Sequence, residues 1–553
     1  MENQTCQNCK KDFIIEPDDF GFYKKVKVPL PTFCPECRYI RRLLDRNEYN
    51  FYKRKCDATG KDIISIYRQE APFPVYEQEY WKSDKFDATA YGRDFDFNRP
   101  FFEQYEELRR EVPHLALVNS NSVNSEYTNQ SEDNKDCYML VTSGENEKCM
   151  YGSWNQISHF CADCYMVLRS EFCYDSINLT KCSKCISCQD CSASVELKFC
   201  IDCRGCVSCF GCVGLREKQY HWFNEPLTKE EYDKKIKEYV LTPDSIKEAK
   251  EKLAELRLKN PVKYYHGSQV QNSSGDYMEN CQRALYIFNC KENKDASYMQ
   301  DAWLRTEDCR DCTEIILGEL AYEVQWVETP HRSMFIRSCF NTITDSCYCD
   351  MCFGVSDCFG CFGLKKGKYC ILNKQYTKED YFKLKEKIIE RMRETKEWGE
   401  YFPSKVSPFA YNESMVQHYF PLTKEEALQK GYAWYDRLAR NYEITEDVIQ
   451  CSSQKDSESM KKYPLCTTAF RTTPLKLSLY KILNLPIPEK CFPCRRQDRL
   501  ELRNPRKLWH RQCMCDKKHA HHKEGCDIEF ETSYAPNRPE IVYCEKCYQQ
   551  EVY

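Results

Sequence analysis

The chain lacks long apolar runs, and its start lacks an apolar segment. Nowhere in its 553 residues does a stretch approach the roughly 18 apolar residues that a membrane span needs. The N-terminal sequence MENQTCQNCKKDF has no apolar core of the kind found in secretory signals. We therefore expect a soluble protein in the cytoplasm, where thiols stay reduced.

Catalytic fingerprints are missing as well. The sequence has no phosphate-binding P-loop, no dinucleotide-binding glycine motif, no HExxH and no GxSxG elbow. Histidines number only ten, and the formal net charge of −4 provides no overall attraction to nucleic acid or membrane. An enzymatic function thus has no support in the sequence, and any affinity for nucleic acid has to come from a local patch.

Cysteine is abundant, with 39 residues that fall into four clusters at 1–56, 137–212, 281–370 and 451–547. In a reducing compartment this density indicates metal ligands or buried thiols, because disulfides are rare there. The odd count also disfavours a closed disulfide framework. The clustering predicts several domains.

The first cluster contains two Cys-x-x-Cys pairs, Cys6/Cys9 and Cys34/Cys37. Four thiolates in two such pairs are typical of a tetrahedral zinc site. The second pair begins an arginine-rich segment that we expect to be helical, and the N–H groups at a helix N-terminus favour thiolates. We predict a treble-clef-like module, in which a hairpin presents the first pair and a helix presents the second.

The last cluster repeats this module at an offset of 457 residues, which indicates an internal duplication. The repeat is carried by matching cysteines, aromatic residues and arginines, among them Cys34 and Cys491, Cys37 and Cys494, Tyr23 and Tyr480, and Arg38 and Arg495. The equivalent of Cys6 would be position 463, which is a tyrosine, so we predict that Cys451 replaces it, with an insertion at Ser452–Leu465. The predicted ligands are Cys451, Cys466, Cys491 and Cys494.

The C-terminal copy continues into a second predicted zinc site, made by Cys513, Cys526, Cys544 and Cys547. An inserted segment adds further candidate ligands that could replace a cysteine or hold another ion, namely Cys515, His519, His521 and His522. In the N-terminal copy only Cys56 of this second site remains, and we interpret it as an orphan thiol. We expect about three zinc ions in all; the alternative is that these cysteines are simply buried.

The middle of the chain is also duplicated, since 119–240 recurs as 268–390 at an offset of 149. In the first copy all fourteen cysteines from Cys137 to Cys212 are separated by multiples of three, and five of them are 12 apart. Neither a helix nor a plain strand gives a period of three. Rungs of twelve residues with one inward residue in three would give it, so we predict β-solenoid-like repeats, each followed by a helix. The second copy keeps this phase only in pieces.

Three interpretations of the central cysteines stay open. They are small apolar residues that fill a narrow interior, metal ligands, or redox thiols of the Cys-x-x-Cys kind. The metal interpretation concerns the densest positions of the two copies, which are Cys200, Cys203, Cys209, Cys212, Cys349, Cys352, Cys358 and Cys361.

Both module helices are rich in arginine, at spacings of three and four residues that place several on one face. Such a face could neutralise nucleic-acid phosphates. Alternatively it is solvated, or its arginines pair with acidic residues of a neighbouring domain. The candidate nucleic-acid contacts are Arg38, Arg41, Arg42, Arg495, Arg496 and Arg499.

Sequence strings at the two ends carry a family resemblance. They are Cys-Pro-x-Cys-Arg-x-x-Arg-Arg near the start, with Phe-Tyr-Lys and Pro-x-Pro before it, and Glu-Ile-Val-Tyr-Cys-Glu-Lys-Cys-Tyr near the end. In these strings the chain resembles a cysteine-rich "probable zinc-ribbon" (treble-clef) family of candidate-phyla bacteria. The resemblance covers the ends specifically and the middle loosely. It implies zinc binding by the cysteines of both ends, and it implies no activity.

Together these features predict a multidomain, mixed β-rich α+β chain. The expected order is an N-terminal zinc module (1–90), two cysteine-rich repeats with helices (91–260 and 261–400), a helical linker (401–445) and a C-terminal zinc module (446–553). The leading hypothesis is a non-enzymatic zinc-binding scaffold whose partner is a protein or a nucleic acid. The alternatives are a thiol-dependent redox enzyme or metal-handling protein, and a structural subunit of a larger assembly.

Overall fold

A computed structural model describes residues 2–552 except 317, 320, 321, 329, 332, 333, 335, 336, 338–342, 438–442, 446 and 447. The predicted mixed α+β, multidomain class with cysteine clusters at both ends is confirmed. Residues 438–442 of the predicted linker, 401–445, lie outside the described residues.

The chain divides into two compact units, each made of segments that are distant in sequence. Unit 1 is Met1–Leu117, Tyr265–Asp436 and Arg506–Leu508; unit 2 is Val118–Tyr264, Arg437–Pro505 and Trp509–Tyr553. The N-terminal cysteine module therefore shares a unit with the second central repeat, and the C-terminal module shares one with the first repeat.

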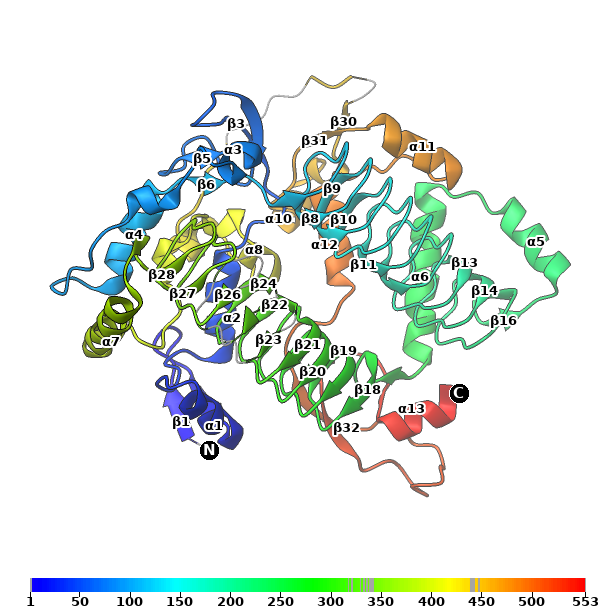
Figure 1. The fold of residues 1–553 in the computed structure, drawn as a ribbon. Helices are drawn as coiled ribbons and strands as arrows, with labels where there is room; N and C mark the ends of the chain where they lie inside the picture. Colours follow the sequence, from blue (N-terminus) through cyan, green and yellow to red (C-terminus); the bar gives the residue numbers. More distant parts are fainter. Residues whose placement is uncertain are drawn as a thin grey trace. The chain divides into compact units, whose positions relative to one another are not determined.

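The central repeat of unit 2, called the first ladder below, is a series of short parallel strands (Figure 1). Its strands are β7 (Asn119–Ser120), β8 (Asn129–Glu132), β9 (Tyr138–Gly144), β10 (Met150–Ser153), β11 (Tyr165–Leu168), β12 (Ile177–Thr180), β13 (Val195–Lys198), β14 (Val207–Phe210) and β15 (His221–Trp222), with β16 (Glu225–Pro226) antiparallel at the end. Partners are 12 residues apart, as in Met150 with Tyr138. Isolated bridges, such as Met150 with Ala162, continue the same offset. We call each twelve-residue period a rung.

The backbone of the first ladder also has a period of three. From Asn121 to Phe223 every third residue is left-handed, with φ between +47° at Ala193 and +71° at Gly214. Such a conformation costs about 1–2 kcal/mol for each residue that carries a side chain. Hydrogen bonds between rungs offset that cost; Met150, for example, donates its N–H to Cys161 O at 2.9 Å and accepts from Asp163 N–H at 3.1 Å.

The cysteines of the first ladder occupy its interior. All fourteen from Cys137 to Cys212 belong to one buried cluster, together with leucine and valine side chains. The thiol of Cys200 lies 3.3 Å from Lys198 O and 3.6 Å from Cys209 O, as a donor to both carbonyls. Ser194 donates its hydroxyl to Ser192 O at 2.8 Å and also accepts the N–H of Cys206 at 3.1 Å. A small side chain with one polar atom therefore suits the inward position.

The repeat of unit 1, the second ladder, follows the same plan with interruptions. Its strands are β18 (Gly267–Gln271), β19 (Gly275–Gln282), β20 (Ile287–Lys294), β21 (Trp303–Glu307), β22 (Thr313–Ile316), β23 (Gly318–Glu319), β24 (Gln325–Glu328), β25 (Pro330–His331), β26 (Ile343–Thr344), β27 (Ser356–Phe359), β28 (Lys368–Ile371) and β29 (Lys374–Gln375). The offset is 12 between Cys358 and Cys370, but 13 between Asn293 and Thr306. Added residues of this kind explain why the cysteine phase survives only in pieces.

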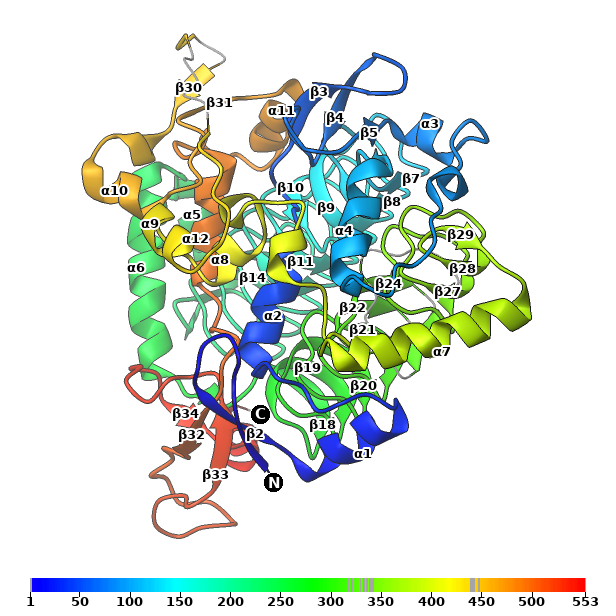
Figure 2. The ribbon, with the colours of Figure 1, turned by 90° about the vertical axis from the view of Figure 1, so that its left-hand side faces the viewer.

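Hairpins and helices form the remainder of unit 1. They are β1 (Glu2–Thr5), β2 (Asp12–Ile15), α1 (Pro17–Lys25), α2 (Pro35–Leu44), β3 (Tyr52–Lys55), β4 (Asp62–Ser65), β5 (Val75–Tyr76), α3 (Gln78–Lys82), α4 (Phe101–Glu111), β6 (His114–Leu115), α7 (Lys378–Glu394), α8 (Val416–Tyr419) and α9 (Lys424–Gln429). Helix α2 lies against the second ladder (Figure 2). Helix α7, which follows that ladder, begins where the Thr377 side chain accepts the N–H of Asp380.

Unit 2 contains the matching set. Its further elements are α5 (Lys229–Glu238), α6 (Pro243–Lys259), β17 (Val262–Lys263), β30 (Val448–Gln450), α10 (Ser457–Lys462), β31 (Ala469–Arg471), α11 (Pro474–Ile482), α12 (Phe492–Glu501), β32 (Trp509–Gln512), β33 (Glu529–Thr532), β34 (Val542–Tyr543) and α13 (Glu545–Val552). Helix α6 covers apolar side chains of the ladder, where Leu253 shares a buried cluster with Phe199 and Phe210. In the described part of the chain, no helix combines the length and apolar character of a membrane span.

The burial of the ladder thiols predicts slow alkylation. Among the described cysteines only Cys9 and Cys466 are not fully buried, and burial raises the pKa of the Cys137 thiol to about 11. We expect Cys137 to react with N-ethylmaleimide roughly 100-fold more slowly than a free thiol. We expect the other ladder cysteines to become reactive only on unfolding, because they are buried. Peptide mass spectrometry after timed labelling measures this. Rapid labelling of Cys200–Cys212 in folded protein would contradict the ladder interior described above.

Candidate metal centres

The N-terminal module brings its four predicted cysteines together. The sulfur atoms of Cys6, Cys9, Cys34 and Cys37 all lie within 4.8 Å of one another. Cys6 follows β1 in the turn to β2, and Cys34 is the N-cap of α2, with Pro35 in the first turn of the helix. Hairpin and helix therefore each deliver one pair, and the spacing suits one four-coordinate ion.

Backbone N–H groups stabilise negative charge on these sulfurs. Cys34 donates its N–H to Cys6 Sγ at 3.2 Å, and the Asn8 side-chain amide donates to Cys37 Sγ at 3.3 Å. Burial raises the pKa of the Cys6 thiol, but backbone N–H donors outweigh burial and lower that pKa to about 7. A thiolate, which is the form that binds metal, is thus accessible near neutral pH.

The first C-terminal site places Cys451 where Cys6 stands in the N-terminal module. Cys451, Cys466, Cys491 and Cys494 lie within 4.8 Å of one another. Cys491 donates its N–H to Cys451 Sγ at 3.2 Å, which repeats the contact between Cys34 and Cys6. Cys451 N–H also bonds Thr468 O, just as Cys6 N–H bonds Lys11 O, 457 positions earlier.

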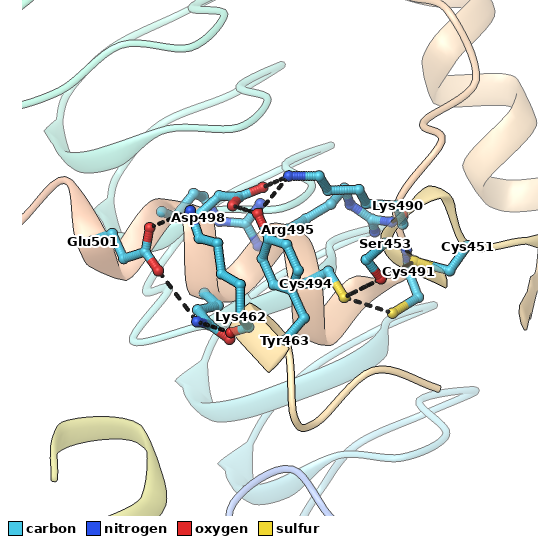
Figure 3. Close-up of polar contacts among 12 residues, drawn as sticks. Cys451, Ser453, Lys462, Tyr463, Lys490, Cys491, Cys494, Arg495, Asp498 and Glu501 are labelled. Carbon is cyan, nitrogen blue, oxygen red and sulfur yellow. Dashed lines mark hydrogen bonds and ion pairs between the residues drawn. The ribbon is translucent and has the colours of Figure 1, made fainter. Parts of the chain in front are cut away.

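Hydrogen bonds and ion pairs join α12 to the insertion that separates Cys451 from Cys466 (Figure 3). The Tyr463 hydroxyl donates to Asp498 at 2.6 Å, Lys490 binds the same carboxylate at 2.7 Å, and Lys462 pairs with Glu501 at 3.0 Å. Ser453 also places its hydroxyl 3.3 Å from Cys494 Sγ. These contacts therefore hold the longer loop in place, so that Cys451 stays beside the cysteines of α12.

The third site joins Cys513, Cys526, Cys544 and Cys547, again with all four sulfurs within 4.8 Å. Cys544 donates its N–H to Cys513 Sγ at 3.1 Å. The other candidate ligands of this region lie beside it: Cys515, His519 and His522 form a ligand group with Cys547, and His521 and His522 form one with Cys526 and Cys547.

In the N-terminal module the counterpart of the third site has lost its ligands. Cys56 accepts the N–H of Glu77 at 3.3 Å, as Cys513 accepts that of Cys544, but glutamate replaces the cysteine. Thr59 donates its hydroxyl to Glu77 at 2.8 Å. Polar contacts hold this hairpin, and Cys56 belongs to none of the metal-ligand groups of the described residues.

The arginines of α2 are buried in ion pairs within unit 1. Arg38 Nε lies 2.8 Å from an oxygen of Asp311, and Arg42 lies 3.6 Å from the other oxygen. Arg41 donates to both oxygens of Glu323 at 2.8 Å and to Glu400 at 3.0 Å. The three arginines are between 0% and 6% exposed.

Helix α12 repeats this arrangement within unit 2. Arg495 lies 3.0 Å and Arg499 3.2 Å from the same oxygen of Asp163, and Arg499 also reaches Asp175 at 3.2 Å. Arg496 is buried as well. We call each set of two arginines on one aspartate a clasp: Arg38 and Arg42 on Asp311, and Arg495 and Arg499 on Asp163.

The arginines predicted to contact nucleic acid are buried inside the protein instead. Arg38, Arg41, Arg42, Arg495, Arg496 and Arg499 are buried, and five of them have carboxylate partners at 2.8–3.6 Å. A guanidinium already desolvated and neutralised in this way does not reach a phosphate. The interpretation that these arginines pair with acidic residues of another segment is the one that the structure supports.

Sequence reasoning missed the acidic partners. Asp163 and Asp311 both stand in a Cys-x-Asp-Cys string, and both are left-handed, with φ of +55° and +59°. A matching ring contact follows in each unit, Tyr23 with Tyr322 at 5.3 Å and Tyr480 with Tyr174 at 5.5 Å between centroids. These equivalences need an offset of 148 in place of 149. The string alone does not single them out, because it also occurs at Asp190 and Asp202.

The ladder cysteines do not form metal sites in the described residues. None of Cys200, Cys203, Cys209, Cys212, Cys349, Cys352, Cys358 and Cys361 belongs to a group of ligand atoms within 4.8 Å. Their thiols are hydrogen-bond donors to nearby backbone carbonyls, as in Cys352 to Asp350 O at 3.3 Å. The metal interpretation of these eight cysteines is therefore not supported.

Comparisons with known proteins provide no family. No protein-family model and no curated protein matches the chain. One similar solved structure comes from Desulfovibrio desulfuricans G20 and has a provisional assignment as an acetyltransferase. It is 11% identical and covers 55% of this chain and 77% of its own, with a TM-score of 0.11. A likeness this low carries no argument about fold or function.

The first clasp predicts that loss of the Asp311 charge strongly destabilises the fold. We expect Asp311→Asn to lower the free energy of unfolding by about 3–5 kcal/mol, because two buried guanidiniums lose their counter-charge. Urea denaturation followed by circular dichroism measures this. Asp308→Asn is the matched control, since Asp308 pairs with an exposed lysine, Lys25, and we expect a change below about 1 kcal/mol. Equal effects of the two substitutions would contradict the clasp.

Proposed function

We propose that the protein is a zinc-binding, non-enzymatic scaffold, in which three four-cysteine sites hold structural zinc. The observation that carries this proposal is the closed donor set of each site: four sulfurs within 4.8 Å, from a turn and a helix or hairpin. Four thiolates complete the tetrahedral shell of zinc and leave no position for a substrate or a reactive water. Zinc is favoured over other ions because thiolate-only, tetrahedral sites suit it.

We extend the proposal to the fold of the modules and of the ladders. We interpret the hairpin-and-helix modules as treble clefs, and the two ladders as short β-solenoids with twelve-residue rungs. The twelve-residue strand offset and the left-handed residue in every third position support the second interpretation. We also propose that the chain belongs to the cysteine-rich zinc-ribbon family of candidate-phyla bacteria and lies in the cytoplasm. The sequence strings at the two ends and the abundance of cysteine support this.

A protein is the partner that the side chains favour. Because the arginine helices are buried in clasps, they leave little support for a nucleic-acid surface. Stacked repeats present extended surfaces that commonly bind other proteins. The redox alternative would need an accessible thiol of low pKa, whereas the described ladder cysteines are buried.

Metal content of single-site variants tests the proposal. We expect Cys37→Ser and Cys494→Ser each to lose one zinc ion per chain, because each removes one of four thiolates from a closed site. Elemental mass spectrometry of reduced, purified protein measures the ratio. Cys56→Ser is the matched control, since its thiol lies in the degenerate hairpin, and we expect no loss of metal. Wild-type protein without bound metal would exclude a zinc scaffold.

Removal of metal should loosen both modules. We expect a strong zinc chelator to lower the Tm by more than about 10 °C, because binding free energy at structural sites is folding free energy. Scanning calorimetry in reducing buffer measures the shift, and added zinc should restore the original Tm. An unchanged Tm after verified removal of metal would argue against a structural role.

A further inference from the structure

Beyond the three four-cysteine sites, a second set of ligands lies against the third site. Cys515, His519, His522 and Cys547 have ligand atoms within 4.8 Å of one another. Cys547 belongs also to the group formed with Cys513, Cys526 and Cys544. The two sets therefore share one sulfur and have no other member in common.

The three histidines are carried by a ten-residue insertion. In the N-terminal module the turn after Cys56 closes at once, with the N–H of Cys56 bonded to Lys61 O at 2.8 Å. In the C-terminal module the equivalent bond joins Cys513 N–H to Ile528 O at 2.9 Å. A further bond from Cys526 N–H to Cys515 O, also 2.9 Å, closes the base of the inserted loop 516–525.

Burial of apolar side chains does not explain why loop 516–525 folds back toward the cysteine sulfurs of the third site. Its seven other residues are exposed, and only His519, His521 and His522 are partly buried. His519 and His522 exchange backbone hydrogen bonds at 3.0 and 3.2 Å, which brings their rings to 5.2 Å between centroids. His522 Nε2 lies 3.2 Å from Cys547 Sγ, while its Nδ1 is buried without a hydrogen-bond partner.

His519, the first histidine of the loop, has a carboxylate neighbour. Glu551 Oε1, from α13, lies 3.4 Å from His519 Nε2. Metal-bound imidazoles commonly donate their second N–H to a carboxylate, which fixes the ring and raises its basicity. Lys517 pairs with the same glutamate. The loop thus has the outer contact expected of a metal-binding histidine.

We infer that the 513–547 part of the C-terminal module binds two divalent ions bridged by the Cys547 thiolate. One ion is held by Cys513, Cys526, Cys544 and Cys547, and the other by Cys515, His519, His522 and Cys547. Each ion then has four ligands, and the second ion accounts for the fold of an otherwise exposed loop. This inference rests on the proposed zinc binding and adds a fourth ion to it.

The other overlapping group, made by His521, His522, Cys526 and Cys547, is the competing arrangement. It would share two sulfurs with the first ion, and His521 and His522 would be its only own ligands. It would also leave Cys515, which is buried, without a metal. The bridged pair through Cys515 and His519 uses all five buried cysteines between Cys513 and Cys547.

Native mass spectrometry of the zinc-loaded full chain tests the inference. We expect four zinc ions for the wild type, three for His519→Gln and for Cys515→Ser, and four for His521→Gln, the matched control. Three ions in all four proteins would overturn the fourth site and leave the proposed function standing, whereas no bound metal would overturn both. Loss of an ion in His521→Gln but not in His519→Gln would overturn this ligand set in favour of the competing one.

Cadmium substitution tests the bridge itself. With ¹¹³Cd in place of zinc, we expect two of the four resonances to be coupled to each other through the shared sulfur. Four uncoupled resonances would show that the ions do not share Cys547 and would overturn the bridged arrangement.

Discussion

A buried ion pair fixes how each terminal module meets its ladder. Two arginines, one helical turn apart, close on a single aspartate that stands at a left-handed position of a rung: Arg38 and Arg42 on Asp311, Arg495 and Arg499 on Asp163. Separating such groups would leave charge buried without a partner, at a cost of several kcal/mol. The helix that carries the arginines therefore has one position on the ladder, and the rest of the module is built around it.

The candidate metal sites and the clasps depend on each other. Cys34 and Cys491 are the N-caps of the arginine helices, so a metal bound there would fix the end of each helix from which the arginines follow. The module interiors consist largely of cysteine: one buried cluster is Cys6, Cys34 and Cys37, and another is Cys451, Cys491 and Cys494 with Tyr463. Domains this small rarely bury enough apolar surface to fold alone. A bound metal and contact with a ladder would together stabilise modules that bury too little apolar surface on their own.

The sequence was informative where the constraint is local. Cys-x-x-Cys spacing is set by one turn, so the ligand sets could be read directly, and the tyrosine at 463 pointed to Cys451. The cysteine phase likewise follows from the repeating left-handed residue. The clasps could not be read, because Asp163 resembles other left-handed polar residues of its ladder, such as Asp133 and Asp136. Its role depends on which module docks on which repeat. The offset between Asp163 and Asp311 also differs from the 149 of the later cysteines, because a residue is added after Asp311, where Pro330 pairs with Ile343.

The crosswise pairing of modules and repeats has a consequence for synthesis on the ribosome. The N-terminal module emerges before the ladder on which it docks, since Arg41 and its partner Glu323 are separated by 282 residues. During elongation the first ladder is complete before the second, but Arg495 of its own module is made 332 residues after Asp163. A nascent chain therefore lacks the partners of the α2 arginines until Asp311 and Glu323 have been made, and lacks the partner of Asp163 until Arg495 has been made. Unit 1 therefore cannot finish folding before the first ladder of unit 2 has been translated, and unit 2 cannot finish before unit 1 has been translated.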